Sequence, residues 1–218
     1  MPSRYDLLVF DWDGTLVDST GHIAVSLQSS FEDLGLPVPT DEAARHVIGL
    51  GLQDALTYLN PDLPESRYIE VTDRYRHHFL SGDAGISCFP DVAESIPSLN
   101  RNGYLLAVAT GKSRRGLDRS MHALALAPHF HASRCADEGF PKPHPDMLET
   151  LMTLLGTTPE RTLMIGDTTH DLQMAANARV GAIAVSYGAH PVAELERLEP
   201  LACVASFREL MQWLKQNG

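Results

Sequence analysis

The residues best suited to chemistry are two aspartates that directly follow an apolar run. The run is Tyr5–Phe10, and Asp11 and Asp13 stand in the sequence Asp-Trp-Asp-Gly-Thr at residues 11–15. Because side chains alternate along a strand, the two carboxylates point the same way at its end, and Trp12 between them points to the core. Neighbouring carboxylates repel each other at neutral pH unless a cation lies between them or one is protonated. The motif is therefore either a solvated turn or one half of a cation site.

A second acidic motif follows another apolar strand, in Gly-Asp-Thr-Thr-His-Asp at residues 166–171. Asp167 stands at the end of that strand. Asp171 lies near the start of the next helix, where a carboxylate is also favoured simply as a helix cap. Mg²⁺ takes hard oxygen ligands of this kind. Two acidic motifs at strand ends predict a magnesium site, although Asp171 alone would be taken for a cap.

The groups that a phosphoryl group needs are found elsewhere in the chain. Thr110, Gly111 and Lys112 offer a hydroxyl, an accessible amide and a cation directly after a strand. Lys142 lies between two prolines, and the chain has only three lysines in all. Arg114 stands at the start of a predicted helix, where a cation opposes the helix dipole. We therefore expect Lys112 and Arg114 to attract an anionic substrate and Lys142 to serve the phosphoryl group.

The elements that must position these groups alternate between strand and helix. Such alternation is typical of a doubly wound α/β fold with a parallel sheet, in which ligands bind beyond the carboxyl ends of the strands. The predicted strands are Tyr5–Phe10, Tyr104–Thr110, Thr162–Gly166, Gly181–Ser186 and, more weakly, Ala202–Ala205. The predicted helices between them are Asp91–Asn102, Ser113–Ala127, His144–Leu155, His170–Ala178 and Phe207–Gln216.

The segment between the first and second strands breaks this alternation. It holds no convincing strand, and Pro and Gly residues separate its helical stretches. We expect an all-helical domain at residues 18–85, inserted into a core made of residues 1–17 and 86–218. The crossings Val17–Thr20 and Ser81–Cys88 are candidate hinges for a lid. The predicted helices of the insert are His22–Leu34, Thr40–Val47, Leu52–Leu59 and Glu65–Leu80.

Composition narrows the class of partner. The chain has 218 residues and a formal net charge of −11, which argues against nucleic acid or an anionic membrane because both require clustered cations. Its apolar runs are too short to span a membrane. Three cysteines, odd in number and far apart, fit reduced thiols, so we expect a cytoplasmic protein.

Taken in order, the motifs resemble the four sequence motifs of the haloacid dehalogenase superfamily, and the helical insert resembles its C1 cap. The resemblance covers nearly the whole chain. It implies a Rossmann-like core that hydrolyses a small phosphorylated metabolite with Mg²⁺. The residues that carry it are Asp11-Trp12-Asp13-Gly14-Thr15, Thr110-Gly111-Lys112, Lys142-Pro143 and Gly166-Asp167 with Asp171.

The resemblance also implies a role for each matching residue. Asp11 would be the nucleophile that becomes phosphorylated. Asp13 would act as general acid and then general base, and its backbone carbonyl would bind the metal. Thr110 would hydrogen-bond a phosphoryl oxygen, and Lys142 would neutralise charge on Asp11 and the phosphate. The metal would be held by Asp11, Asp13 and Asp167, with Asp171 in support, directly or through water.

Within the superfamily, Asp18-Ser19 and Ile23-Ala24 are most similar to phosphoglycolate phosphatase-like members. Gly111 departs from that pattern, because such members usually carry Asn after the Thr. The backbone amide is kept and a side-chain contact is lost, which leaves the substrate open. Arg45 and the turn at residues 49–51 lie where relatives place a substrate-specificity loop. We therefore name Gly111, Lys112 and Arg45 as candidate substrate contacts.

Several other chemistries of the superfamily are weighed against hydrolysis. Dehalogenases lack the second aspartate, and phosphonatases need a cap lysine, of which there is none between residues 17 and 85. A mutase of the β-phosphoglucomutase type shares every core motif but carries a histidine where Ile23 stands, and His22 is one residue early. A non-catalytic phospho-ligand-binding protein and a one-step metal hydrolase also stay open. Both a monomer and a homodimer fit the sequence.

Overall fold

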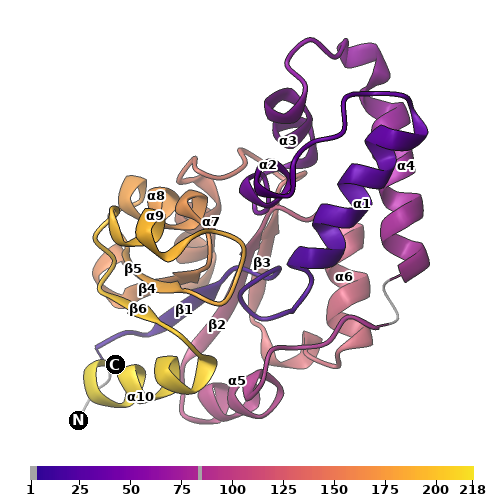
Figure 1. The fold of residues 1–218 in the computed structure, drawn as a ribbon. Coiled ribbons are helices and arrows are strands. Elements are labelled where there is room, and N and C mark those ends of the chain that lie inside the picture. The colour runs from indigo at the N-terminus through magenta and orange to yellow at the C-terminus, as the bar shows by residue number, and fades with distance from the viewer. Residues whose placement is uncertain (1–3, 83–84) are drawn as a thin grey trace.

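The computed structural model describes residues 4–82 and 85–218. Residues 1–3 at the start of the predicted core, and residues 83–84 within the predicted crossing Ser81–Cys88, lie outside the described residues. Figure 1 shows a sheet with helices on both sides and a separate group of helices next to one end of it.

The core is built on one parallel sheet whose six strands are ordered β3-β2-β1-β4-β5-β6. Each strand pairs in parallel with its neighbours, as the doubly wound prediction requires. In this register Phe10 lies opposite Val108 on one side and Ile165 on the other, so the carboxyl ends of the three strands lie side by side, within two residues of one level. The strands are β1 (Leu7–Phe10), β2 (Leu105–Thr110), β3 (Ala132–Cys135), β4 (Thr162–Gly166), β5 (Gly181–Val185) and β6 (Ala202–Val204).

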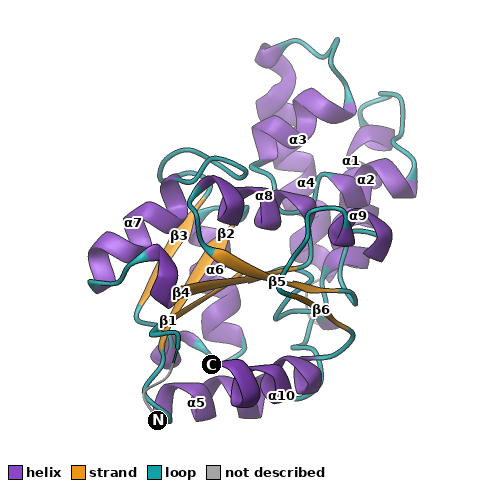
Figure 2. Ribbon diagram, turned by 90° about the vertical axis from the view of Figure 1, so that its left-hand side faces the viewer, coloured by secondary structure: helices purple, strands orange, loops and turns teal. Residues whose placement is uncertain are grey.

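Helices cover both faces of this sheet, because its strands are apolar on both sides. One face packs against α5, α6 and α10, whose buried Ile96, Leu117 and Leu210 join Phe10 in one cluster. The other face packs against α7 and α8, through residues such as Leu148 and Met174. The core helices are α5 (Val92–Arg101), α6 (Arg114–Ala123), α7 (Asp146–Leu155), α8 (Thr169–Asn177), α9 (Val192–Glu196) and α10 (Phe207–Asn217). Figure 2 shows these layers in a second view.

Three core elements differ from the sequence prediction. The edge strand β3 and the short helix α9 were not predicted, because the polar run at residues 132–135 has no strand pattern and α9 has only five residues. The helix predicted over Ser113–Ala127 ends at Ala123. Ala125 then adopts a positive φ of 55°, which breaks the helix before Pro128 in the 3₁₀ turn that follows.

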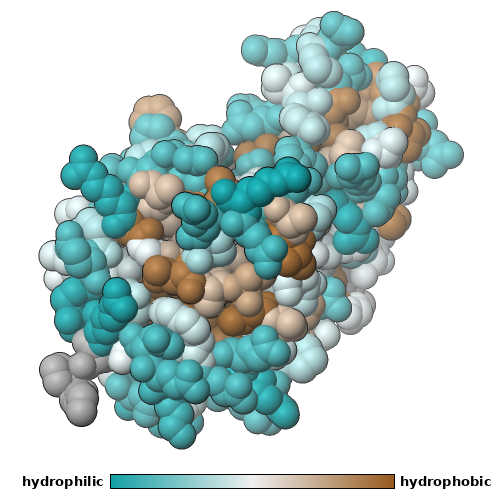
Figure 3. Space-filling view, turned by 60° about the vertical axis from the view of Figure 1, so that its left-hand side comes forward, coloured by the Kyte–Doolittle hydropathy of each residue, from teal (hydrophilic) through white to brown (hydrophobic). Residues whose placement is uncertain are grey.

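The insert contains helices and no strand among its described residues. Its helices are α1 (Thr20–Asp33), α2 (Asp41–His46), α3 (Leu52–Leu59) and α4 (Tyr68–Gly82), the last preceded by the 3₁₀ turn Glu65–Arg67. They have small apolar cores of their own, one around Phe31, Leu56 and Val71. Figure 3 shows the insert as a narrower lobe that projects from the core, and we call it the cap. Across residues 4–82 and 85–218, no helix combines the length and apolar character that a membrane crossing requires.

Candidate active site

Three carboxylates from two strand ends meet in a buried cluster. Asp11 directly follows β1, Asp167 directly follows β4, and Asp171 lies in the first turn of α8. Each is at most 1% exposed, and one oxygen from each lies within 4.8 Å of the others. The cause is the parallel register, because β1 and β4 are neighbours and end at the same level.

Lys142 is the cation that the structure brings to this cluster. Its Nζ lies 2.7 Å from Asp11 Oδ1 and 2.6 Å from Asp171 Oδ1. The side chain is fully buried, which lowers the pKa of the ammonium, but the attraction of Asp11 and Asp171 outweighs burial and the pKa ends above its ordinary value. Lys142 therefore stays charged and neutralises part of the cluster.

Asp171 serves the helix and the cluster at once. Its Oδ2 accepts hydrogen bonds from the backbone N–H and the hydroxyl of Thr168, at 3.1 and 2.7 Å, and so forms a capping box at the start of α8. Its Oδ1 accepts from Lys142. The helix cap that the sequence offered for Asp171 is confirmed, whereas its contact with a metal ion stays a prediction.

The cluster carries more negative charge than Lys142 offsets. Burial, together with Asp171, raises the pKa of Asp167 to about 7. Burial also raises the pKa of Asp11 well above its ordinary value, with the neighbouring aspartates adding to the effect and Lys142 opposing it. Both shifts show that the site favours additional positive charge.

The donor atoms present fit a hard divalent cation. Asp11 Oδ2 is buried and has no hydrogen-bond partner among the described residues. Asp167 is held in place by the Thr15 hydroxyl at 2.7 Å and the Ala189 N–H at 2.8 Å. Gly14 approaches so closely that a Cβ there would lie 2.1 Å from Asp167 Oδ2. An all-oxygen set of buried carboxylates is the type of site that Mg²⁺ occupies.

The side chain of Asp13 makes its hydrogen bonds outside the three-carboxylate cluster. Its Oδ1 accepts from the Ser19 hydroxyl at 2.5 Å and from Lys112 Nζ at 2.9 Å. The same Lys112 Nζ lies 4.7 Å from the centroid of the Phe79 ring on cap helix α4. Trp12, between the two aspartates, is buried in the core as predicted, and its Nε1 donates to Ser120.

The cap contacts the core directly at Gly111. A Cβ at this position would lie 2.5 Å from the carbonyl oxygens of both Gly49 and Leu50. These carbonyls belong to the cap turn that the sequence marks as a candidate specificity loop. Only glycine leaves room for so close an approach, and a side chain here, such as the Asn that the family resemblance led us to expect, would collide with these carbonyls. Neighbouring Thr110 is buried, and its Oγ1 accepts from the Lys112 N–H at 3.2 Å.

The sequence analysis named two arginines as possible contacts of the substrate, and the structure shows which groups each of them binds. The expectation that Arg114 contacts substrate is wrong, because its guanidinium binds Glu138 at 2.8 and 2.9 Å and also Asp118. These contacts are the structural gain that offsets its position at a helix start. Arg45 binds Asp41 at 2.8 Å and lies 3.4 Å from the Thr20 hydroxyl, so its contact with substrate stays a prediction.

Tyr75 on cap helix α4 was not anticipated from the sequence. The side chain is half-buried and its phenol lies near Asp13, so desolvation together with that carboxylate raises its pKa. No local motif marks this residue, since a tyrosine on an apolar helix face is usually core. Only the packing of α4 over the strand ends reveals it. His170, next to Asp171 in the sequence, donates from Nε2 to the His46 carbonyl at 2.9 Å.

A doubly wound parallel sheet with a buried acidic site and a helical cap defines an α/β enzyme. Residues 8–185 match the family model described as haloacid dehalogenase-like hydrolase. The chain belongs to this family, as the sequence resemblance implies.

Similar proteins agree with this assignment. The "probable phosphatase IndB" of Dickeya dadantii is 36% identical over 94% of this chain and 91% of its own length. A phosphoglycolate phosphatase of Agrobacterium fabrum is 30% identical over 94% and 90%. A hydrolase from Pseudomonas syringae has the same fold, with a TM-score of 0.89 at 19% identity over 97% and 98% of the two chains. The protein is therefore a hydrolase whose curated relatives are phosphatases.

Proposed function

We propose that this protein is a Mg²⁺-dependent phosphatase that hydrolyses a small, phosphoglycolate-like phosphate monoester through a phosphorylated Asp11. One observation carries the proposal. Lys142 holds one oxygen of the buried Asp11 carboxylate, while the other oxygen has no hydrogen-bond partner within the described chain. An oriented, partly neutralised carboxylate of this kind is suited to attack phosphorus.

In the first step Asp11 attacks the phosphorus atom and the bond to the ester oxygen breaks. Lys142 offsets the repulsion between the carboxylate and the phosphoryl oxygens, and Thr110 donates a hydrogen bond to one of them. Asp13 gives its proton to the departing ester oxygen, which leaves as a hydroxyl group and not as an alkoxide. General acid–base catalysis of this kind typically raises the reaction rate about 10²–10⁴-fold.

In the second step water attacks the phosphorus of the aspartyl-phosphate. Asp13, now ionised, accepts the proton of that water, and inorganic phosphate leaves with Asp11 restored. Ser19 and Lys112 hold Asp13 Oδ1 through both steps, so we assign the proton transfers to Oδ2. Dividing one displacement into two lowers the barrier of each.

Asp11, Asp167, the Asp13 carbonyl and, in support, Asp171 would hold Mg²⁺. The ion would supply positive charge that masks the carboxylates and the phosphoryl oxygens. The excess negative charge of the cluster and the partnerless oxygen of Asp11 support this assignment.

The substrate class follows from the relatives and from the cap. Curated relatives that are about 30% identical are phosphoglycolate phosphatases. Lys112 and Tyr75 lie next to Asp13, where the leaving group must be, and the cap turn on Gly111 leaves little room beyond it. A small anionic leaving group fits these surroundings, with Arg45 as a further candidate contact. Three free thiols fit the reducing cytoplasm as the place of action.

The test is phosphate release from a panel of metabolite monoesters, with Mg²⁺ and with EDTA. We expect release from small carboxylated phosphate esters with Mg²⁺ and none with EDTA. Asp11→Asn should abolish release and also the covalent phosphate that acid quenching traps on the wild-type protein. Full activity of Asp11→Asn would overturn the proposal.

The mutase alternative is weakened by the contacts of His22. That side chain donates from Nε2 to the Phe79 carbonyl at 2.7 Å, within the cap, and is not directed at the strand ends. A mutase would need a bisphosphate activator and would release little phosphate, which the same panel detects.

A further inference from the structure

A short loop just after strand β5, at residues 187–190, encloses the carboxylate of Asp167. The Ala189 N–H donates to Asp167 Oδ2 at 2.8 Å, and the His190 N–H donates to the Asp167 carbonyl oxygen at 3.3 Å. A Cβ on Gly188 would lie 2.2 Å from Asp167 Oδ2. Because the loop packs this closely against Asp167, a shift of the loop would shift the carboxylate.

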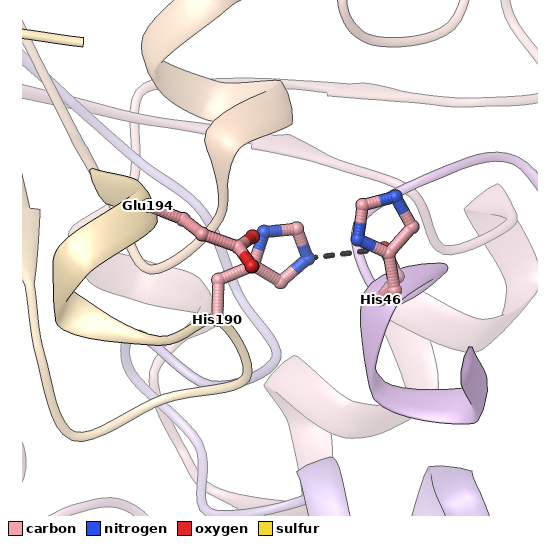
Figure 4. Close-up of side chains that lie close together, drawn as sticks. All are labelled: His46, His190 and Glu194. Atoms are coloured by element: carbon pink, nitrogen blue, oxygen red, sulfur yellow. Dashed lines mark hydrogen bonds between the residues drawn. The ribbon is translucent and has the colours of Figure 1, made fainter. Parts of the chain in front are cut away.

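The far end of this loop is fixed by both nitrogens of the His190 ring. Its Nε2 donates to the His46 carbonyl oxygen at 3.0 Å, and its Nδ1 accepts from the Thr169 N–H at 3.1 Å. Figure 4 shows the His46 and His190 side chains, whose ring planes are 10° apart. His190 therefore anchors the loop at this end, and Tyr187 is the residue that stands at the other end.

The near end of the loop is joined to the turn that follows Asp13. The Tyr187 hydroxyl donates to the Thr15 carbonyl oxygen at 3.0 Å. Thr15 is fully buried, and within residues 4–82 and 85–218 no backbone N–H donates to that carbonyl. Leaving a buried carbonyl without a hydrogen bond is unfavourable. Tyr187 therefore holds Thr15 in place.

Thr15 in turn orients Asp167. Its hydroxyl donates to Asp167 Oδ1 at 2.7 Å, while the Ala189 N–H donates to Oδ2. Two hydrogen bonds on opposite oxygens fix the rotation of the carboxylate. An ionised carboxylate has about four acceptor sites, so both oxygens can still bind a cation.

The ring of Tyr187 is fixed where the chain returns from the cap. Its centroid lies 4.6 Å from that of Phe89, whose N–H donates to the Leu16 carbonyl oxygen at 3.0 Å. Desolvation of the half-buried phenol raises the pKa of Tyr187, and the negative charge of Asp167 adds to this effect. The hydroxyl therefore keeps its proton and stays a donor to Thr15.

We propose that Tyr187 is a positioning residue for the divalent cation, because through Thr15 it holds Asp167 in the orientation that binds the ion. This rests on the proposed function, in which Asp167 is a ligand of Mg²⁺. Residues that orient a metal ligand by a hydrogen bond typically change metal affinity 10–100-fold when they are substituted. Tyr187 acts one hydrogen bond further away, so its hydroxyl should contribute about three- to tenfold.

The binding test is a titration of the metal-free full chain with Mn²⁺, followed by the electron paramagnetic resonance signal of the free ion. Mn²⁺ suits the same oxygen ligands as Mg²⁺. Tyr187→Phe keeps the ring against Phe89 and should bind Mn²⁺ about three- to tenfold more weakly than wild type. Tyr68→Phe is the matched control, since it loses a tyrosine hydroxyl that lies 3.0 Å from Thr57 Oγ1 in the cap, and its affinity should equal that of wild type. Equal affinity in Tyr187→Phe and wild type would overturn the proposal.

A double substitution shows whether Tyr187 acts through Thr15. Thr15→Val removes the hydroxyl that holds Asp167 and should weaken Mn²⁺ binding about 10–100-fold. Adding Tyr187→Phe to Thr15→Val should then change the affinity by no more than about twofold, because the two residues act in series. Losses that multiply in the double variant would contradict a route through Thr15.

Phosphate release and a further variant separate this inference from the proposed function. Tyr187→Phe should need about three- to tenfold more Mg²⁺ for half-maximal release and keep its kcat at saturating Mg²⁺. A lower kcat with an unchanged Mg²⁺ requirement would refute the positioning role alone. Asp167→Asn that binds Mn²⁺ as tightly as wild type would instead refute the metal site of the proposed function.

Discussion

Gly111→Ala is the substitution that most directly tests how closely the cap approaches the core. The added Cβ would lie 2.5 Å from the Gly49 and Leu50 carbonyl oxygens, whereas ordinary contacts begin at 3.4 Å. The cap turn must therefore lift by about 0.9 Å, and the obstacle is backbone, which cannot rotate aside. Overpacking of this kind costs about 1–3 kcal/mol.

This overpacking destabilises the closed arrangement of cap and core, and it leaves the fold of the cap and the fold of the core unchanged. A penalty of about 1–3 kcal/mol lowers the population of the closed form, and with it kcat/KM, about 5–150-fold. The assay is steady-state phosphate release, combined with urea unfolding to show that global stability changes little. Gly111→Asn, which introduces the residue that the family resemblance led us to expect, should lose at least as much.

Gly21→Ala is the matched control for the same substitution. Its Cβ would meet only the Arg45 guanidinium, at 4.0 Å, and it lies inside helix α1. Alanine there should stabilise the helix by about 0.5–1 kcal/mol and leave kcat/KM unchanged. If Gly111→Ala keeps full kcat/KM, the cap does not close onto Gly111 during turnover and the reasoning is wrong.

Further predictions concern charge. Lys142→Met leaves buried carboxylates unpaired, so the free energy of unfolding should fall by about 3–5 kcal/mol and phosphate release should be lost. Lys215→Met, the control, should change neither quantity. A stable and active Lys142→Met protein would contradict this prediction. Arg114→Gln loses the contact with Glu138, so the free energy of unfolding in urea should fall by about 1 kcal/mol while kcat/KM stays unchanged. A large rise in KM would show instead that Arg114 contacts the substrate. Burial lowers the pKa of His190 from 6.5 to about 4, so the stability from its neutral ring is present above pH 6.5 and is lost as pH falls toward 4. Between pH 7 and pH 5 the free energy of unfolding, measured in urea, should therefore fall by about 2 kcal/mol more for wild type than for His190→Gln. Equal losses would show that the pKa of His190 is not lowered in the folded protein.

The sequence prediction is most accurate where local pattern and fold impose the same constraint. Strands buried on both faces are apolar throughout, so β1, β2, β4 and β5 and the polar residues at their ends can be located from the chain alone. β3 cannot be located in this way, because an edge strand of four residues needs no continuous apolar run. Arg114 was misinterpreted because its partner Glu138 lies 24 residues away and no local pattern links them.

The sequence by itself determined the strands β1, β2, β4 and β5, the helical insert and the identity of the groups at the strand ends, because short-range periodicity decides which segments are buried and where they stop. Only the tertiary structure decided which atoms meet. Lys142 reaches Asp11 across 131 positions, and the carbonyls of the cap turn rest on Gly111. His46 meets His190 and Glu194 for the same reason. Each of these contacts depends on how cap and core pack together, and packing between distant segments leaves no periodic trace in either one.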